Sequence, residues 1–574
     1  MSTPIELIAA IFSITNNYVT RNRILSLPFR SPYPPIPPPP YDPLPEFVSS
    51  EWGGSKTKDK VAIFDGFTGQ DRTFAEYGAS TGSMAAALKY ELGVTEESVI
   101  ALFSPNHVDY VPICLSVATL GAKLTPINPL YTQRELSDIL KRSRTQVLIT
   151  HAHLKDVALA AARENPNVKH VVTIPHMDGI DIPEGTINLN SLKDHDHSPI
   201  MSTSDAVKAN MATHPYLLPY SSGTTGLPKA VCLSHQNLVA NLQQMNEAEA
   251  LAFPCDHRLI SPLPFFHIYG FLATALYCAW RGQEVITMSG RFDLELFCKL
   301  VEEHKPHRAH LVPPIILGLA KHPMIDNFDM SSLNMIISAA APLGADVEQE
   351  VCQRLDCGVK QAWGMSELSP IGTFTSDYNI KSGSIGPLAA STYGKIIDIE
   401  TGRSLGPNEE GELVIKGPQV MLGYLDAADK TAECLSKDGW LRTGDVARYD
   451  EDGFFYITDR LKELIKVRGY QVAPAELEAL LLTNEYVKDA AVIPVLDEAS
   501  GELPRAYVVL KDTEEAGTKT EHEIEEWVKE RVAPYKRLAG GVIFTDEIPK
   551  SASGKILRRL LVDQDRHGVT TDED

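Results

Sequence analysis

The chain has 574 residues, of which 43% are hydrophobic and 22% charged, and its formal net charge is -22 at pH 7. The length predicts about three to five domain-sized units with sizeable cores. The excess of acidic residues excludes a general nucleic-acid-binding surface, which needs a basic face, so a small anionic ligand would depend on local basic groups.

Eight cysteines are spread along the chain without a C-x-x-C pair. This distribution is typical of reduced thiols in an intracellular protein. Beyond the N-terminal segment, no stretch approaches the roughly 20 unbroken apolar residues of a membrane span. We therefore expect an intracellular protein without a transmembrane segment, in the cytoplasm or in an organellar matrix.

The first 46 residues differ in composition from the rest of the chain. Residues 1–29 carry one acidic residue, Glu6, together with arginines and an apolar run, which fits either a mitochondrial type of presequence or a surface helix. Ten prolines within residues 28–45 predict an extended connector rather than a packed element. The chain ends in Thr-Asp-Glu-Asp and so lacks a C-terminal peroxisomal tripeptide.

Regular elements are expected from about Phe47 onward. Residues 61–74 form a predicted hairpin, and helical spacing follows over 77–91. Buried strands are then expected at 99–103, 123–126 and 146–150, with helices at 109–121 and 135–143. This alternation predicts a parallel sheet covered on both faces.

The segment Tyr220–Lys229 reads YSSGTTGLPK. Its glycines let backbone N–H groups approach an anion, its hydroxyls add donors and its lysine adds charge. It is not the common P-loop, because two residues separate its glycines and Ala230 follows Lys229. Strands at 216–219 and 231–233 flank it, so we expect a phosphate-gripping loop between strands. A flexible linker is the alternative that the run alone favours.

Three further segments carry candidate site residues. LPFFHIYG places His267 among aromatic residues, where a core histidine would also fit. AAAPLG, residues 339–344, joins a turn to small side chains, as a ligand-facing wall requires. In QAWGMSE, Glu367 is a candidate Mg²⁺ ligand and Ser366 a candidate phosphate contact, because magnesium favours carboxylates and phosphate oxygens. An ordinary helix start would show the same Ser-Glu pair.

The residue pattern changes in the last part of the chain. Short strands broken by glycine over 383–423 predict a small antiparallel barrel or sheet. WLRTGD then puts Asp445 behind a Thr-Gly turn, where a carboxylate can bind a ribose diol. Four cations within 460–468 fit a solvated face or a hinge whose basic groups meet phosphates. A small α+β unit follows and ends in a small-residue loop with Lys555.

Read jointly, SSGTTGLPK, FFHIYG, APLG, GWLRTGD and DRLKELIKVRGYQVAPAELEALL occur in an order and spacing that resemble the adenylate-forming enzymes. This superfamily includes acyl-CoA synthetases, insect luciferases and peptide-synthetase adenylation domains, and the chain is most similar to its 4-coumarate:CoA ligase-like group. The resemblance covers about residues 50–565. It implies an α/β fold with a large N-terminal domain of two layered α/β subdomains plus a small β-barrel, and a small mobile α+β C-terminal domain.

The resemblance also implies a division of the chain into four parts. We expect an N-terminal extension with a Pro-rich connector at 1–46, an adenylation domain at 47–459, a mobile C-terminal domain at 460–565 and an acidic tail at 566–574.

The implied activity is that of an ATP-dependent carboxylic acid:CoA ligase. The acid carboxylate attacks the α-phosphate of ATP to give acyl-AMP and pyrophosphate, and the thiol of CoA then displaces AMP. The expected cofactor is Mg²⁺, with ATP and CoA as co-substrates, because the first step needs the phosphate charge neutralised. The expected partners are these small molecules alone, with no nucleic acid and no carrier domain in the chain.

The resemblance assigns roles to residues by position. The expected ATP and AMP contacts are Ser221, Ser222, Gly223, Thr224, Thr225, Lys229, Ala340, Gln361, Ala362, Ser366, Asp445 and Arg460, with Glu367 as the Mg²⁺ ligand. The expected acyl pocket contains Tyr269, Ala273 and Ala339, and the expected CoA contacts are Arg291, Arg468 and Gly469. The expected catalytic residues are His267, Lys462, Lys466, Gln471 and Lys555.

Two of these groups are expected to act at different times. Lys555 would bridge the carboxylate and the α-phosphate during adenylation. Lys462, Lys466 and Gln471 would belong to the face presented after the C-terminal domain rotates about a hinge for thioester formation.

Several residues depart from the coumarate ligase pattern. Trp363 replaces a tyrosine, Ser366 a threonine, Arg468 a lysine and Ala230 a glycine. Ala339 replaces a pocket glycine, and Ala273 stands where some coumarate ligases have serine; one methyl at a pocket wall changes preference by about 1–3 kcal/mol. These changes leave an aryl or a medium-chain acid as the substrate.

Three alternatives to a CoA ligase stay open at this point. They are a luciferase-like oxygenase, an acyl-AMP ligase that loads a carrier protein, and a non-catalytic nucleotide-binding protein that kept the fold. Arg291 and Arg468 favour CoA as the acceptor.

Overall fold

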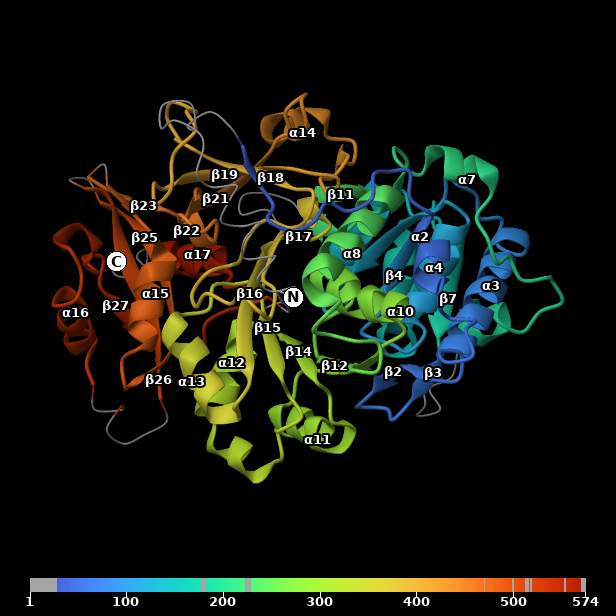
Figure 1. Cartoon of the computed structure of the whole chain (residues 1–574), viewed down its shortest axis with the longest axis horizontal. Helices are drawn as coiled ribbons and strands as arrows, with labels where there is room; N and C mark the ends of the chain where they lie inside the picture. Colours follow the sequence, from blue (N-terminus) through green and yellow to red (C-terminus); the bar gives the residue numbers. More distant parts are fainter. Residues whose placement is uncertain are drawn as a thin grey trace, which may run out of the picture.

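The structure is a computed structural model that describes residues 28–176, 182–221, 229–468, 470–497, 500–511, 516, 519–551 and 554–568. Figure 1 shows the C-terminal unit at one end of the molecule and the first sheet at the other, with the second and third sheets between them. This arrangement confirms the predicted fold class, with two α/β layers, a small antiparallel region and a smaller α+β unit.

The first sheet has nine strands in the described part of the chain, in the order β10-β11-β9-β5-β4-β6-β7-β8, with β20 paired to β11. The strands are β4 Val99–Phe103, β5 Lys123–Ile127, β6 Val147–His151, β7 His170–Ile174, β8 Ile187–Asn188, β9 Pro215–Leu217, β10 Tyr220–Ser221, β11 Lys229–Ser234 and β20 Gly423–Tyr424. The helices of this region are α3 Phe74–Tyr90, α4 Tyr110–Thr119, η2 Ala152–Leu154, α5 Gln133–Ser143, α6 Lys155–Glu164, η3 Leu189–Leu192, α7 Asp205–Asn210 and α8 His235–Glu249.

The centre of this sheet is buried on both faces. Strands β4, β5, β6 and β7 run parallel, and every residue of β4 is buried. Ala101 and Phe103 share a buried cluster with residues of α5 and α6, whereas Ile100 and Leu102 belong to the main core with α3 and α4. The continuous apolar run of β4 is explained by this two-sided burial.

The second sheet has eight strands, in the order β17-β16-β15-β14-β12-β13-β2-β3. The strands are β2 Val61–Asp65, β3 Asp71–Thr73, β12 Arg258–Ser261, β13 Glu284–Thr287, β14 Arg308–Leu311, β15 Met335–Ser338, β16 Gly358–Gly364 and β17 Ile371–Phe374. Its helices are α9 Ile268–Gly270, η4 Phe271–Leu276, α10 Tyr277–Arg281, α11 Leu294–His304, α12 Pro313–Lys321, η5 Pro323–Asn327, α13 Ala345–Leu355 and η6 Ser366–Leu368. The predicted hairpin is β2 and β3.

The third sheet occupies the region expected to form a small barrel. It is a five-stranded antiparallel sheet in the order β1-β18-β19-β21-β22. The strands are β1 Phe29–Arg30, β18 Tyr393–Ile397, β19 Gly411–Lys416, β21 Leu441–Tyr449 and β22 Phe455–Arg460, and helix α14 Ala428–Cys434 lies between β20 and β21 in the chain. The expected start of the C-terminal domain at residue 460 falls at the last residue of β22.

The C-terminal unit has its own sheet, β24-β23-β26-β25, with β27 paired to β26. Its elements are β23 Ile465–Val467, β24 Tyr470–Val472, α15 Pro474–Leu482, β25 Val487–Asp497, β26 Gly501–Leu510, α16 Glu521–Lys529, η8 Pro534–Lys536, β27 Val542–Phe544 and α17 Arg558–Gly568. Most of its buried residues form clusters of their own, while Leu464 and Ala473 cluster with Val446 of β21. Helix α17 continues past the expected start of the tail at residue 566.

The proline-rich segment packs on the core, so the prediction of an unpacked connector is wrong. Ile36, Tyr41 and Leu44 are buried, and helix α2, Leu44–Ser49, follows. The backbone N–H groups of these three residues donate to side chains of the large domain. Because proline has no N–H group, an extended proline-rich segment leaves few donors to satisfy and can lie against a core. Most of the expected presequence lies outside the described residues.

Within the described ranges, no helix is both long enough and apolar enough to span a membrane.

Candidate active site

The loop that carries Lys555 lies against the second sheet's side of the molecule. A Cβ atom added at Gly554 would be 3.3 Å from Val312 Cγ2 and 3.4 Å from Pro314 Cδ, at the start of α12. Burial and the nearby Arg460 lower the pKa of Lys555 to about 8, and Glu463 and Asp445 act in the opposite sense. Residues separated widely in sequence therefore meet at this point.

The ammonium group of Lys555 makes no hydrogen bond or ion pair with any residue in the described part of the chain. Its backbone N–H donates to Ser551 Oγ at 3.1 Å, which shapes the loop. A half-buried cation without a partner is costly unless a ligand supplies the opposite charge. The arrangement fits a lysine whose charge is paired only when an anionic substrate is bound.

Asp445 lies on β21 with its carboxylate buried, next to Lys555. Its Oδ2 accepts a hydrogen bond of 2.9 Å from Trp363 Nε1, and its Oδ1 is 3.3 Å from Arg460 Nε. Burial raises the pKa of Asp445, against the opposing effects of Arg460 and the Trp363 hydrogen bond. The sequence predicted Asp445 and Arg460 as partners of one ligand, but it did not predict the bond from Trp363.

Glu367 is buried on η6, and one of its two carboxylate oxygens has a hydrogen-bond partner. Its Oε1 accepts a 2.8 Å hydrogen bond from the Tyr424 hydroxyl, while no described residue donates to its Oε2. Among the described residues, no group of three or more His, Cys, Asp or Glu is arranged to hold a metal ion. Mg²⁺ usually binds through one or two carboxylates plus substrate phosphates. One free carboxylate oxygen fits an ion that arrives with ATP.

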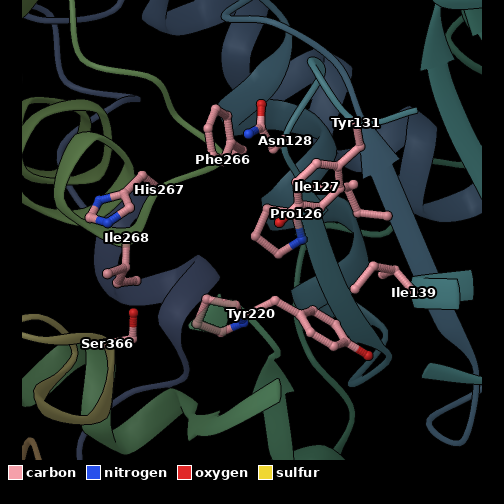
Figure 2. Close-up of a pocket in the computed structure, with 11 residues that line it drawn as sticks. Pro126, Ile127, Asn128, Tyr131, Ile139, Tyr220, Phe266, His267, Ile268 and Ser366 are labelled. Carbon is pink, nitrogen blue, oxygen red and sulfur yellow. The ribbon is translucent and has the colours of Figure 1, made fainter. Parts of the chain in front are cut away.

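A cavity beside this residue is lined by His267, Ser366, Tyr220 and Asn128, among others. Figure 2 shows His267 and Ser366 on one side of it, with Tyr131 and Ile139 on the opposite side. His267 Nδ1 accepts a hydrogen bond from the backbone N–H of Tyr269 at 3.3 Å. Burial lowers the pKa of His267 to about 4, so the ring is neutral at pH 7 and can act only through hydrogen bonds or contacts.

The segment expected to bind phosphate, residues 220–229, begins on β10 and ends on β11, and these two strands pair antiparallel. Tyr220 is opposite Ala230, and Ser221 is opposite Lys229. Ser222, Gly223, Thr224 and Thr225 lie outside the described residues, and of Ser221 only the backbone is described. The ammonium of Lys229 lies 4.8 Å from the centre of the Tyr424 ring.

The expected acyl-pocket residues come from elements that meet in the main core. The Tyr269 hydroxyl donates to the carbonyl oxygen of Ile337, on β15, at 3.4 Å. Ala339 directly follows the end of that strand. Ala273 lies within η4, a π-helical stretch, a geometry that often occurs at functional sites. All three side chains are buried.

The expected adenine wall shows backbone strain. Ala340 has φ +75°, a conformation that costs an alanine of the order of 1–3 kcal/mol and that clusters at ligand sites. The side-chain amide of Gln361 bonds to Leu343 O at 3.1 Å and to Glu348 Oε2 at 2.9 Å. The Gln361 carbonyl oxygen also accepts a hydrogen bond from Thr375 Oγ1 at 3.3 Å, so that contacts within the protein hold both the side chain and the backbone of this residue. Ala362 follows it, half-buried on β16.

Four of the residues expected to serve thioester formation or CoA binding have described side chains. Lys462, Lys466, Arg468 and Arg291 are all exposed. Arg468 is anchored to Ser500 through its backbone N–H at 2.8 Å and through Nε at 3.1 Å. No contact in the described ranges joins Arg291 to Arg468. Gly469 lies outside those ranges, and of Gln471 only the backbone is described, opposite Lys466.

Sequence reasoning missed a buried histidine beside the expected acyl pocket. His310 is fully buried on β14, and neither of its ring nitrogens has a hydrogen-bond partner among the described residues. Its ring centre is 5.7 Å from that of Tyr269. In the sequence the residue stands within a buried strand, and only the packing against Tyr269 makes it a candidate.

Comparison with family models gives two matches. Residues 50–425 match the model described as AMP-binding enzyme, and residues 476–555 match the AMP-binding enzyme C-terminal domain. Together they span most of the chain, and they fall on the large unit and on the smaller C-terminal unit.

Full-length relatives agree with these matches. A probable 4-coumarate–CoA ligase 3 of Dictyostelium discoideum is 37% identical over 88% of this chain and 92% of the relative. A 4-coumarate–CoA ligase 1 of Solanum tuberosum is 37% identical over 93% and 96%. A solved anthranilate CoA ligase with bound anthranoyl-AMP superposes with a TM-score of 0.81 at 23% identity, over 92% of this chain and 98% of that one. That last likeness shows the shared fold.

Proposed function

The chain belongs to the AMP-binding enzyme family and is an AMP-forming acid–CoA ligase that acts through acyl-AMP, and we propose that its substrate is an aryl carboxylic acid. The curated relatives reported above are named for an aryl acid, 4-coumarate. The aromatic Tyr269 beside the small Ala273 and Ala339 supports a flat ring in the acyl pocket. A medium-chain acid is the competing substrate class.

One observation carries the assignment of residues to the first half-reaction. Lys555, which the sequence separates from Asp445 by more than a hundred positions, lies close enough to that carboxylate to influence its pKa. We propose that the Asp445 carboxylate holds the ribose hydroxyls, with Arg460 beside it. Lys555 would then face the α-phosphate and the attacking carboxylate, where its charge stabilises the transition state.

The phosphates would be held on the opposite side of the site. We assign them to the loop that ends in Lys229 and to Ser366, with Glu367 Oε2 available to Mg²⁺. A bound Mg²⁺ would neutralise phosphate charge. The residues themselves orient the tail of ATP and exclude water from the reacting phosphate.

The second half-reaction would use a different arrangement of the C-terminal unit. Lys462, Lys466, Arg468 and Arg291 are exposed here, and the unit has its own core. We propose that it rotates about residues near Arg460, so that the exposed basic face meets CoA.

The test is the acid profile of pyrophosphate release. The purified protein with ATP, Mg²⁺ and CoA is given cinnamic, benzoic, hydroxylated aryl and medium-chain acids in parallel. We expect pyrophosphate, AMP and the matching acyl-CoA, fastest with an aryl acid. Preference for medium-chain acids would overturn the substrate class alone. Failure with every acid would overturn the activity.

A further inference from the structure

One side chain contacts both of the groups that flank the phosphate end of the site. The Tyr424 hydroxyl donates to Glu367 Oε1 at 2.8 Å, and the Tyr424 ring lies under the ammonium of Lys229 with 4.8 Å from nitrogen to ring centre. Neither Glu367 nor Lys229 has another side-chain hydrogen bond or ion pair with a described residue. Tyr424 is therefore their shared support.

The backbone fixes Tyr424 in this place. Strand β20 pairs with β11, so that Tyr424 is opposite Val231, two residues after Lys229. The backbone N–H of Tyr424 donates to Thr431 Oγ1 at 2.9 Å. Nearby, the backbone N–H of Met421 donates to Glu367 O at 2.9 Å. The segment thus holds the Glu367 backbone and side chain at the same time.

The Tyr424 hydroxyl donates to one oxygen of the Glu367 carboxylate and leaves the other without a donor among the described residues. A hydrogen bond from a neutral hydroxyl to a carboxylate is one of the stronger kinds in proteins. It fixes Oε1 and leaves Oε2 pointing elsewhere, whereas an unheld carboxylate would rotate. Glu367 directly follows Ser366, which lines the cavity in Figure 2.

We propose that Tyr424 is a positioning residue for metal-bound ATP, with two separable parts. Its hydroxyl orients Glu367 so that one carboxylate oxygen is free for the metal. Its ring holds the ammonium of Lys229, the first residue of β11, by a cation–π contact. The inference rests on the proposed metal role of Glu367, and it adds a residue outside the sequence motifs quoted above.

The two parts can be removed one at a time. Tyr424→Phe removes the hydroxyl and keeps the ring, while Tyr424→Leu removes both. The readout is ATP affinity by calorimetry, once with saturating Mn²⁺ and once in EDTA. The ratio of these affinities measures the help that the metal gives and needs no acid substrate.

We expect Tyr424→Phe to lower the ratio about tenfold, since it removes a hydrogen bond to a charged group, and to leave the affinity in EDTA unchanged. Tyr424→Leu should in addition weaken ATP binding in EDTA about threefold, the size of an exposed cation–π contact. Tyr456→Phe is the matched control. Tyr456 also donates to a carboxylate, Asp450 Oδ2 at 2.9 Å, and lies under Arg448, on the third sheet.

A double mutant separates this inference from its premise. Glu367→Gln should lower the ratio by itself, and Tyr424→Phe should add nothing in that background, because it acts through Glu367. An unchanged ratio in Tyr424→Phe, or an equal drop with and without Glu367, overturns the proposal. An unchanged ratio in Glu367→Gln overturns it together with the metal role of Glu367. Failure of the ligase activity would appear separately, as no pyrophosphate release with any acid.

Discussion

Two of the clusters of charged side chains among the described residues differ in whether their charges are matched. The first is the closed cluster of Glu249, Arg308, Lys360 and Asp377, between α8 and the second sheet. The second is the open cluster of Asp445, Arg460, Lys555 and Glu463, where the large unit meets the C-terminal unit.

Every charge in the closed cluster has partners of opposite sign. Arg308 NH1 lies 2.8 Å from Glu249 Oε2, and Lys360 Nζ lies 2.6 Å from Asp377 Oδ1. Each base also contacts the other acid. Although burial raises it, Lys360 and Arg308 keep the pKa of Asp377 below its ordinary value. Such a network has no charge left over for a ligand.

The open cluster is incomplete in the same structure. Arg460 reaches Asp445 at 3.3 Å, yet Lys555 forms no ion pair with any described residue. The comparison teaches that burial of charge does not by itself mark a site. A buried or half-buried charge without a partner of opposite sign marks a site, because a ligand must supply the opposite charge.

The largest effect should come from removing the unmatched charge. Lys555→Ala is expected to slow acyl-AMP formation by about 10²–10³-fold, the usual loss for one group that stabilises transition-state charge. Conversion of preformed acyl-AMP to thioester should be retained, because we propose that this step uses the other face of the C-terminal unit. The measurement is single-turnover kinetics of each half-reaction.

Lys550→Ala is the control for this substitution. Lys550 lies in the same loop region but pairs with Asp489 inside the C-terminal unit, so both half-reactions should stay near those of the unchanged protein. Equal losses in both half-reactions of Lys555→Ala would show that the lysine supports the structure and not adenylation.

A substitution in the closed cluster should lower the stability of the fold rather than the rate of the reaction. Lys360→Met leaves Glu249 and Asp377 short of a base and should lower the free energy of unfolding by about 3–5 kcal/mol. Lys321→Met breaks an exposed pair with Glu350 and should cost about 0–1 kcal/mol. Thermal denaturation compares the two. A Lys360→Met protein as stable as Lys321→Met would show that the cluster is not a support of the fold.

The pH dependence sharpens the contrast further. The pKa of Lys555 is lowered to about 8, so the lysine is charged below this pH and neutral above it. The kcat/KM for ATP in acyl-AMP formation should therefore fall as pH rises through about 8, by about tenfold per pH unit beyond it. Lys555→Arg keeps its charge and should remove this alkaline limb. The same limb in Lys555→Arg would assign it to another group.

Much of the fold follows from local pattern. Two such patterns are the apolar run of β4 and the capping box of Thr132 and Glu135, which starts α5. They can be recognised in the sequence because they depend on neighbours in the chain. The family resemblance assigns Asp445 and Arg460 to the same ligand, and the two residues are opposite each other across β21 and β22.

The rest depends on contacts between distant segments. The Trp363 bond to Asp445 spans 82 positions, and the Tyr424 bond to Glu367 spans 57. No periodicity reports such a pair before the sheets assemble. The prediction for the proline-rich segment was wrong for a related reason. The buried hydrogen bonds of this segment are to His235 and Gln236, almost 200 residues away.

The smallest expected effect concerns the support of the open cluster. Trp363→Phe removes the indole N–H that donates to Asp445 Oδ2 and keeps an aromatic ring. Arg460 still holds the other oxygen, so the KM for ATP should rise only about tenfold, near the lower end of the range for a hydrogen bond to a charged group. Steady-state kinetics at saturating acid and CoA measure it.

A double mutant with Asp445→Asn decides how Trp363 acts. If the tryptophan only orients the carboxylate, its loss should matter less once that carboxylate is gone, so the two effects on KM should not add. Trp440→Phe, on the third sheet beside Lys395, should leave KM unchanged. Full additivity would mean that Trp363 meets the nucleotide directly, and the open cluster would then include an aromatic contact of its own.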